Sequence, residues 1–168
     1  SSGDFCPFVD DLLDGYDTVE WAAALPGSNG QVAMWGGSYN GWTQWAAASQ
    51  RPPSLSALAP QMTFTDLYND LLYPGGALSL GVALTWCLAS EVGANLSRLA
   101  LSDQERAQQQ ATFLATVDQV TARTRFEALP LLHDPLLGRE DLATGYVRML
   151  TQQTAGEWAD TALLDRAV

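Results

Sequence analysis

The chain has 168 residues, 47% of them apolar and 16% charged, and its formal net charge at pH 7 is −11. This composition predicts a globular domain with its own core and excludes a disordered chain. The basic residues are all arginine and form no stripe, so we expect neither nucleic acid nor a membrane as a partner. The longest apolar run, residues 77–89, is shorter than a membrane span. The first residues do not have the pattern of a signal peptide, so we expect a cytoplasmic location. These residues also resemble an internal stretch of a longer chain.

Residues 1–61 alternate between helix and strand signals, which predicts an α/β fold with part of a parallel sheet. Asp14 is a candidate N-cap for the first helix, and the breakers at 26–30 end that helix. The two apolar runs are short and uninterrupted, which is typical of strands buried on both faces. The predicted elements in chain order are a helix over residues 15–25, a strand over 31–35, a helix over 42–49 and a strand over 55–59.

Residues 62–155 lack strand signals and are predicted to be helical, with helices over 77–90, 103–128 and 139–153. Ser102 and Glu105 have the spacing of a capping box at the start of the long middle helix. Five positions of that helix have the spacing of a single helix face, which predicts an apolar face formed by Ala107, Ala111, Leu114, Val117 and Thr121. A helical block after a strand–helix–strand unit is typical of a cap over an α/β site. We therefore expect a partial core over 1–61, a helical cap over 62–155 and a return to the core over 156–168.

Ser38 lies in a glycine-rich turn, Gly36-Gly37-Ser38-Tyr39-Asn40-Gly41, between a predicted strand and a predicted helix. A serine hydroxyl is a weak nucleophile, and many hydrolases expose it on such a sharp turn beside a base and donors for an oxyanion. The common pattern is G-x-S-x-G, but here Asn40 takes the place of the last glycine. The turn predicts a nucleophile elbow, and the alternative is an ordinary serine in a strand-to-helix turn.

The stretch 34–48 resembles the elbow of the cocaine esterase and X-prolyl dipeptidyl-peptidase group of α/β-hydrolases, which includes α-amino-acid ester hydrolases and glutaryl acylases. The elbow of this group reads G-x-S-Y-x-G, and Gly36, Ser38, Tyr39 and Gly41 match it position by position. Further stretches that resemble the group are residues 2–5, 14–21, 55–60, 66–68, 74–79, 129–131 and 158–167. The resemblance implies a fragment of an α/β-hydrolase parallel sheet followed by a mostly helical cap.

The same resemblance implies roles for four residues. Ser38 would be the nucleophile and the backbone N–H of Tyr39 an oxyanion donor, whereas the triad Asp and His and the second oxyanion donor would lie outside this chain. Trp86 matches one of two cap tryptophans that line the acyl pocket of cocaine esterase-like enzymes, and Leu72 stands where the other would be. A core role is the alternative for Trp86. We expect no cofactor and no metal.

Other residues that could carry chemistry have simpler interpretations. His133, the one histidine, lies in a proline-bracketed loop and is expected to be a loop residue rather than the catalytic base. Asp66 and Asp70 are four residues apart without further ligand candidates, so we expect a loop or helix N-terminal role rather than a metal site. Cys6 and Cys87 are expected to be two separate thiols, with a disulfide as the alternative.

The sequence thus predicts a serine hydrolase that acts on a small-molecule ester, amide or peptide through an acyl-Ser38 intermediate, with this chain alone inactive. The alternative is a non-catalytic, truncated or degenerate hydrolase-like interaction module. Open strand edges predict that the chain forms a homo-oligomer or associates in another way. The acyl group is left open, because Leu72 in place of a pocket tryptophan makes an aryl-ester preference doubtful.

Overall fold

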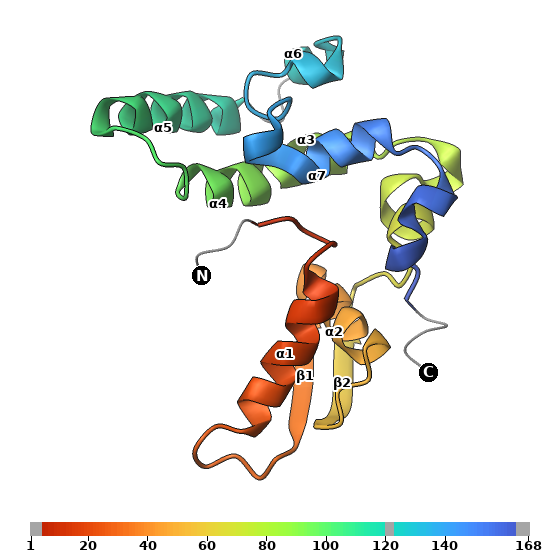
Figure 1. Cartoon of the computed structure of the whole chain (residues 1–168). Helices are drawn as coiled ribbons and strands as arrows, with labels where there is room; N and C mark the ends of the chain where they lie inside the picture. Colours follow the sequence, from red (N-terminus) through yellow and green to blue (C-terminus); the bar gives the residue numbers. More distant parts are fainter. Residues whose placement is uncertain (1–4, 120–122, 164–168) are drawn as a thin grey trace. The chain divides into compact units, whose positions relative to one another are not determined.

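The computed structural model describes residues 5–119 and 123–163, which form two compact units (Figure 1). The strand unit comprises residues 8–76 and 154–163, and the helical unit comprises residues 5–7, 77–119 and 123–153. Among these residues, no helix is both long enough and apolar enough to cross a membrane.

Two parallel strands form the centre of the strand unit. β1 (Val32–Gly37) and β2 (Leu55–Gln61) pair side by side, with Trp35 opposite Ala59. α2 (Tyr39–Ser49) connects them, since parallel strands need a crossover rather than a tight hairpin (Figure 1). The prediction of two strands with a helix between them is confirmed, and each strand runs two residues past its predicted end.

α1 (Asp11–Ala23) packs against α2. Gly15 permits this approach, because a Cβ at this position would lie 3.0 Å from the Cβ of Ala47. The helix begins before the predicted start, so Asp14 lies in its first turn and the assignment of Asp14 as N-cap is wrong. The reason is local: the Asp11 carboxylate accepts the N–H of Phe8 at 2.8 Å and fixes the chain one turn earlier.

One face of the small sheet is exposed. Burial alternates along the first four residues of β1, and Trp35, the fourth, is 82% exposed. Met62, directly after β2, is 90% exposed. α2 covers one face of the sheet, and the other face has no cover among the described residues of the strand unit. Burial of these strands on both faces in the full-length protein stays a prediction.

The segment after β2 returns to the strand unit rather than to the helical one. It forms the π-helical turn η1 (Leu67–Leu72) and the 3-10 turn η2 (Pro74–Gly76), and η5 (Ala155–Thr161) packs against η1. The side chains buried here are Leu67, Leu72, Tyr73, Trp158 and Leu163. The compact units change at Gly76 and at Gln153, and the boundaries at 61 and 155 expected from the sequence stay predictions. The assignment of a catalytic core and a cap stays a prediction.

The helical unit is built on a continuous rod of α3 (Leu80–Trp86), η3 (Cys87–Val92) and α4 (Gly93–Leu96). α7 (Glu140–Thr151) packs along this rod. Their shared core contains Ala83, Leu84, Cys87, Leu88, Val92, Leu142, Tyr146 and Met149. The predicted helix over 139–153 is confirmed, with ends at Glu140 and Thr151. The helix predicted over 77–90 also forms, but it begins at Leu80 and its helical continuation runs to Leu96.

α5 (Asp103–Asp118) opens with the predicted capping box, which is confirmed: Ser102 and Glu105 bond each other's backbone N–H at 3.3 and 2.9 Å. The predicted apolar face is wrong, since α5 has no buried residue and Leu114 is 56% exposed. Its few large apolar side chains do not define one stripe, and the helix contacts the unit through Phe113, which lies against Gly93. α6 (Arg123–Glu127) follows, and residues 120–122 of the predicted helix, Thr121 included, lie outside the described residues.

Candidate active site

Ser38 occupies the turn between β1 and α2 in a backbone conformation that is unusual for serine. Its φ is 55° and its ψ is −125°. A positive φ at a residue with a Cβ costs about 1–3 kcal/mol and persists only where the surroundings enforce it. The residue is also exposed. A strained, exposed serine between a strand and a helix has the geometry of a nucleophile elbow.

Hydrogen bonds on both sides hold this conformation. The N–H of Ser38 donates to the carbonyl of Gln61 at 3.0 Å, which ties the turn to the end of β2. The Ser38 carbonyl accepts the N–H groups of Gly41 and Trp42 at 2.9 and 3.0 Å, and the hydroxyl of Thr63 at 2.8 Å. The first turn of α2 and the segment after β2 therefore enforce the strained backbone together.

Two glycines allow the strand and the helix to approach each other at the turn. Gly36 has a φ of 151°, and a Cβ there would lie 2.8 Å from the Cβ of Asn40. A Cβ on Gly41 would lie 2.7 Å from the Cβ of Thr63. The second close contact falls three residues after Ser38 rather than two. This explains why the sequence reads G-x-S-x-x-G and not the commoner G-x-S-x-G.

Tyr39 is the first residue of α2. The first N–H groups of a helix have no acceptor within the helix and lie at its positive end, which suits an oxyanion donor. The Tyr39 hydroxyl donates to the Asp11 carboxylate, 2.8 and 2.6 Å from its two oxygens, and its ring meets Phe8 edge-on. Burial raises the pKa of Asp11, and the hydrogen bonds from Tyr39 and Phe8 act against that shift. The Tyr39 side chain is thus anchored to α1.

Gln44 lies fully buried on α2, with 0% of its surface exposed. Its Nε2 donates to the carbonyls of Asn40 and Gly36 at 2.9 and 3.2 Å, and its Oε1 accepts the N–H of Ala59 at 3.1 Å. One side chain thus connects the end of β1, the first turn of α2 and β2. Sequence reasoning missed Gln44, together with Thr63 and Asp11. The one available signal was a polar residue among the buried apolar residues of α2.

The two residues predicted to line the acyl pocket belong to different units. Leu72 ends η1 in the strand unit and is 1% exposed, so its side chain packs in the core. Trp86 ends α3 in the helical unit and is half-buried. Trp86 therefore keeps surface that a substrate could contact, whereas Leu72 as described has almost none. The substrate contacts of both residues stay predictions.

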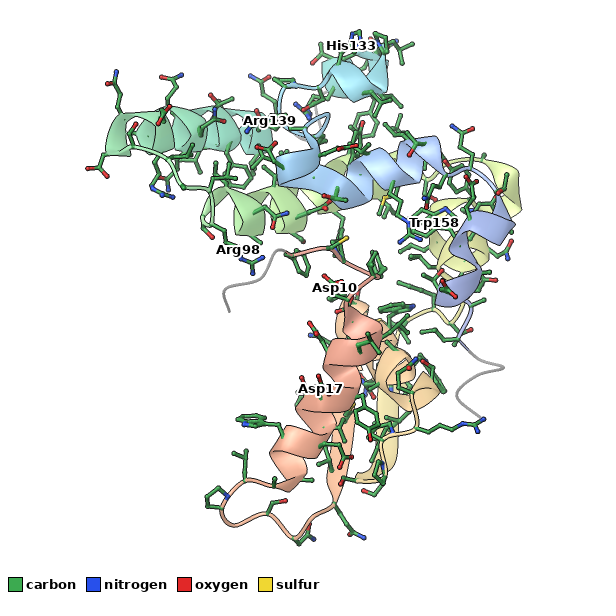
Figure 2. The ribbon with its side chains drawn as sticks, in the orientation of Figure 1. Asp10, Asp17, Arg98, His133, Arg139 and Trp158 are labelled. Carbon is green, nitrogen blue, oxygen red and sulfur yellow. The ribbon has the colours of Figure 1, made fainter. Side chains whose placement is uncertain are left out.

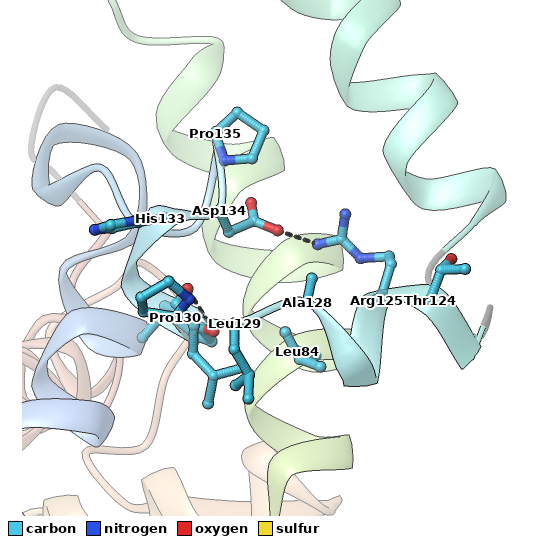
Figure 3. A pocket seen from close by; sticks show the side chains of 11 residues that line it. Leu84, Thr124, Arg125, Ala128, Leu129, Pro130, His133, Asp134 and Pro135 are labelled. Carbon is cyan, nitrogen blue, oxygen red and sulfur yellow. Dashed lines mark hydrogen bonds and ion pairs between the residues drawn. The ribbon is translucent and has the colours of Figure 1, made fainter.

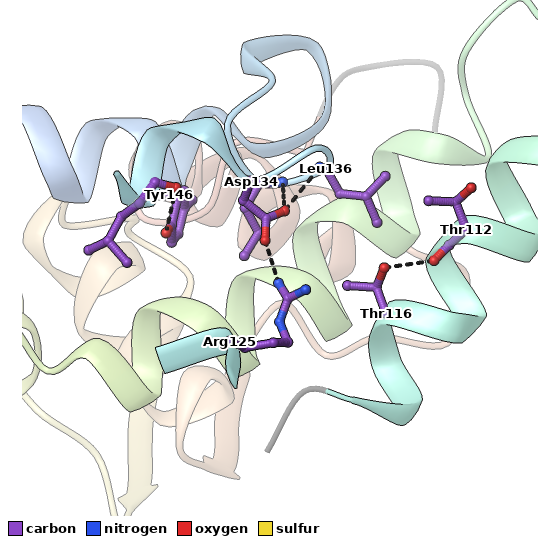
Figure 4. A network of polar contacts seen from close by, with 8 residues as sticks. Thr112, Thr116, Arg125, Asp134, Leu136 and Tyr146 are labelled. Atoms are coloured by element: carbon purple, nitrogen blue, oxygen red, sulfur yellow. Dashed lines mark hydrogen bonds and ion pairs between the residues drawn. The ribbon is translucent and has the colours of Figure 1, made fainter. Parts of the chain in front are cut away.

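His133 lies exposed at the end of η4 (Leu131–His133), in the helical unit (Figure 2). It lines a pocket of about 280 Å³ that also includes Arg125, Asp134 and Tyr146, and its ring points away from the Arg125–Asp134 ion pair (Figure 3). Asp134 binds Arg125 at 2.6 Å and also accepts two backbone N–H groups of the following loop (Figure 4). The polar groups of this pocket hold the loop together, and we assign them no catalytic role.

The remaining candidates have structural roles. Asp66 caps η1 by accepting the N–H of Asn69 at 3.0 Å, which confirms the predicted helix N-terminal role, and Asp70 accepts the N–H of Asp66 at 3.0 Å. The described residues contain no group of three potential ligands that could hold a metal ion. Cys6 and Cys87 form no disulfide, as expected for two separate thiols, and Cys87 is buried.

One family model covers almost the whole chain. The model of the X-Pro dipeptidyl-peptidase family, S15, matches residues 1–165. The chain belongs to the S15 family. This confirms the family resemblance drawn from residues 36–41, and the parallel strands with a large helical part confirm the α/β fold class.

Two similar proteins are both longer than this chain. Cocaine esterase of Rhodococcus sp. (strain MB1 Bresler) is 39% identical over 142 residues, which cover 83% of this chain and 24% of that protein. The crystal structure of a CocE/NonD family hydrolase from Staphylococcus aureus matches with a TM-score of 0.54 and 32% identity, over 66% of this chain and 20% of that one. The chain thus spans about a quarter of the length of its curated relative.

Proposed function

We propose that this S15-family chain is the nucleophile-bearing part of a serine hydrolase that cleaves small-molecule esters or amides, peptides included. The observation that carries the proposal is the backbone of Ser38, an exposed serine held at a φ of 55° between β1 and α2. A strained elbow is costly to maintain, and such strain is typical of functional positions. Family membership and the similarity to cocaine esterase support acyl transfer as the reaction class.

In the proposed reaction, the Ser38 oxygen attacks the carbonyl carbon of the substrate and its proton passes to a base. The backbone N–H of Tyr39 stabilises the negative charge that develops on the carbonyl oxygen. The leaving alcohol or amine takes a proton and departs, and water then hydrolyses the acyl-Ser38 intermediate to the free acid. We place the base, its acidic partner and the second oxyanion donor in parts of the protein outside this chain. The chemistry requires no cofactor.

Substitution of the nucleophile tests this proposal in the full-length protein that contains the chain. Ser38→Ala is expected to lower kcat on 4-nitrophenyl esters by about 10³-fold or more, because the covalent route is lost. The fold should survive, since the Ser38 side chain is exposed. Ser49→Ala, at the other end of α2, is the matched control and should keep wild-type kcat.

Two outcomes contradict the proposal. One is a well-folded Ser38→Ala protein that retains more than about a tenth of the wild-type kcat, which removes Ser38 from the mechanism. The other is a full-length wild-type protein that hydrolyses no ester or amide and does not react with a fluorophosphonate probe at Ser38. That result would favour a hydrolase-like interaction module.

A further inference from the structure

The carboxamide of Gln44 binds the backbone on both sides of Ser38. Its Nε2 donates to the carbonyl of Gly36, two residues before the serine, and to that of Asn40, two residues after it. Its Oε1 accepts the N–H of Ala59 in the neighbouring strand. One fully buried side chain therefore makes three hydrogen bonds to the backbone around the elbow, in addition to the backbone hydrogen bonds of Ser38 itself.

The bonds to Gly36 and Ala59 lie near the end of the strand pair. In the register of the two strands, Gly36 stands opposite Pro60. The Gln44 carboxamide supplies a donor to the Gly36 carbonyl from outside the strand pair. It also occupies the N–H of Ala59, one residue earlier in β2. These contacts join the end of β1 and the first turn of α2 to β2 through one side chain.

Glutamine is the side chain that this position requires. Its carboxamide offers donors and an acceptor without a charge, and two of its three partners here are acceptors. Glutamate has the same shape, but its carboxylate would face the carbonyl oxygens of Gly36 and Asn40. Asparagine is one methylene shorter. Methionine has a similar length and can fill the volume but can make none of the three bonds.

We propose that Gln44 is a positioning residue of the elbow, which aims the Ser38 hydroxyl and the Tyr39 N–H by fixing the backbone between Gly36 and Asn40. The inference rests on the proposed function of Ser38. A shift of the elbow by a fraction of an ångström misplaces both the nucleophile and an oxyanion donor, and neither group contacts the remote parts of a substrate. The effect of Gln44 should therefore appear in kcat rather than in KM.

The first test compares Gln44→Met with Gln50→Met in the full-length protein. Gln50 is the C-cap of α2 and its carboxamide donates to the Ser49 hydroxyl, so it is a matched control at the end of the same helix. Gln44→Met is expected to lower kcat by about 10- to 100-fold per folded active site with KM within about twofold, and Gln50→Met to leave both unchanged. Unaltered kcat in Gln44→Met overturns the proposal.

The second test uses Gln44→Glu and its pH dependence. A protonated glutamic acid has one O–H donor and one carbonyl acceptor and can replace part of the amide, whereas the carboxylate cannot donate. The ratio of variant to wild-type kcat, measured at each pH, is expected to be highest at low pH and to fall as the introduced carboxyl ionises. A side chain that merely stabilised the fold would alter the melting temperature without this recovery, and a flat ratio overturns the proposal.

A crystal structure of Gln44→Met separates this inference from the assignment of Ser38. We expect the Ser38 φ to leave the region near 55° that it occupies in the wild type, whatever the activity of Ser38→Ala turns out to be. An unchanged elbow backbone in Gln44→Met overturns the positioning role even if Ser38 is the nucleophile. Failure of both Gln44 variants to fold at every pH would also overturn it, because Gln44 would then serve the stability of the unit.

Discussion

At the elbow, the end of β1 and the first turn of α2 lie so close together that one added methyl group is expected to destabilise the fold. Gly36 combines a φ of 151° with no room for a Cβ, which would lie 2.8 Å from the Cβ of Asn40. Gly36→Ala is therefore expected to lower the free energy of unfolding by about 2–4 kcal/mol, from backbone strain plus overpacking. Gly30→Ala is the control, since Gly30 also has a positive φ of 83° but no neighbouring atom within 4 Å. Urea denaturation measures the unfolding free energy of both variants. Equal decreases would show that the close contact at Gly36 contributes nothing to the destabilisation.

Trp86 offers a prediction about specificity at the same scale. If its half-buried ring lines the acyl pocket, Trp86→Ala should change kcat/KM unequally across ester acyl groups, by about 1–3 kcal/mol for the preferred one. Trp21→Ala removes a 64% exposed tryptophan from α1 and serves as the control. A uniform loss across all substrates that follows a lower melting temperature would assign Trp86 to the core instead.

Between η3 and α7, a buried carboxyl replaces helix hydrogen bonds that a kink removes. The backbone of α7 is non-helical at Ala143, with φ −145° and ψ 56°. The N–H groups of Gly145 and Tyr146 donate to Glu91 at 2.6 and 3.3 Å, and Glu91 is 0% exposed. Gly145 makes room for this carboxyl, since a Cβ there would lie 3.0 Å from a Glu91 oxygen. The junction of two helices therefore depends on one acidic side chain.

Burial raises the pKa of Glu91 to about 7, although the two backbone N–H groups and Cys87 act in the opposite direction. The folded state thus binds the Glu91 proton more tightly than the unfolded chain does. The contribution of this proton to the stability of the folded state is complete below pH 4.5 and is lost as the pH rises through 7. Burial also raises the pKa of Cys87, and it raises that of Tyr146 to about 12, so neither neighbour titrates in this window.

Glu91→Gln tests this linkage, because the amide cannot titrate. From pH 5 to pH 8 the unfolding free energy of the wild type should fall relative to that of Glu91→Gln by up to about 3 kcal/mol. Chemical denaturation at several pH values gives the difference directly. A constant difference across this range would mean that Glu91 keeps one protonation state throughout.

Local signals account for what the sequence predicts well. The two apolar runs, the glycine turn at 36–38 and the capping box at Ser102 are each complete within a few residues, and each forms as predicted. The partners of Gln44 and of Asp11 lie up to 15 and 28 residues away, so no local pattern marks them. The exposure of the expected apolar face of α5 likewise depends on tertiary neighbours that its weakly patterned sequence does not specify.

At the scale of the whole molecule, the exposed side of the sheet is the feature that a globular protein would not leave in water. Trp35 in β1 is 82% exposed, and Ala33, Ala57 and Ala59 in the two strands are exposed as well. Met62, directly after β2, is 90% exposed. The sheet has two strands in the described residues, so each strand has one edge that the other does not pair. Exposed apolar surface and unpaired strand edges both favour association with another protein surface.

We predict that the 168-residue chain on its own self-associates and is catalytically silent. Its net charge of −11 opposes association, but salt screens that repulsion over a Debye length of about 8 Å at physiological ionic strength. Light scattering after size exclusion should therefore show a dimer or larger species, more so at high salt. Trp35→Ser with Met62→Ser should shift it toward monomer, whereas Leu13→Ser, at a 69% exposed position on α1, should not.

Hydrolysis of 4-nitrophenyl esters by the 168-residue chain should not exceed that of its Ser38→Ala variant, because loss of the base typically removes about 10⁴- to 10⁶-fold of the rate. A monodisperse monomer with Ser38-dependent turnover would contradict both parts, and His133 would then become the candidate base.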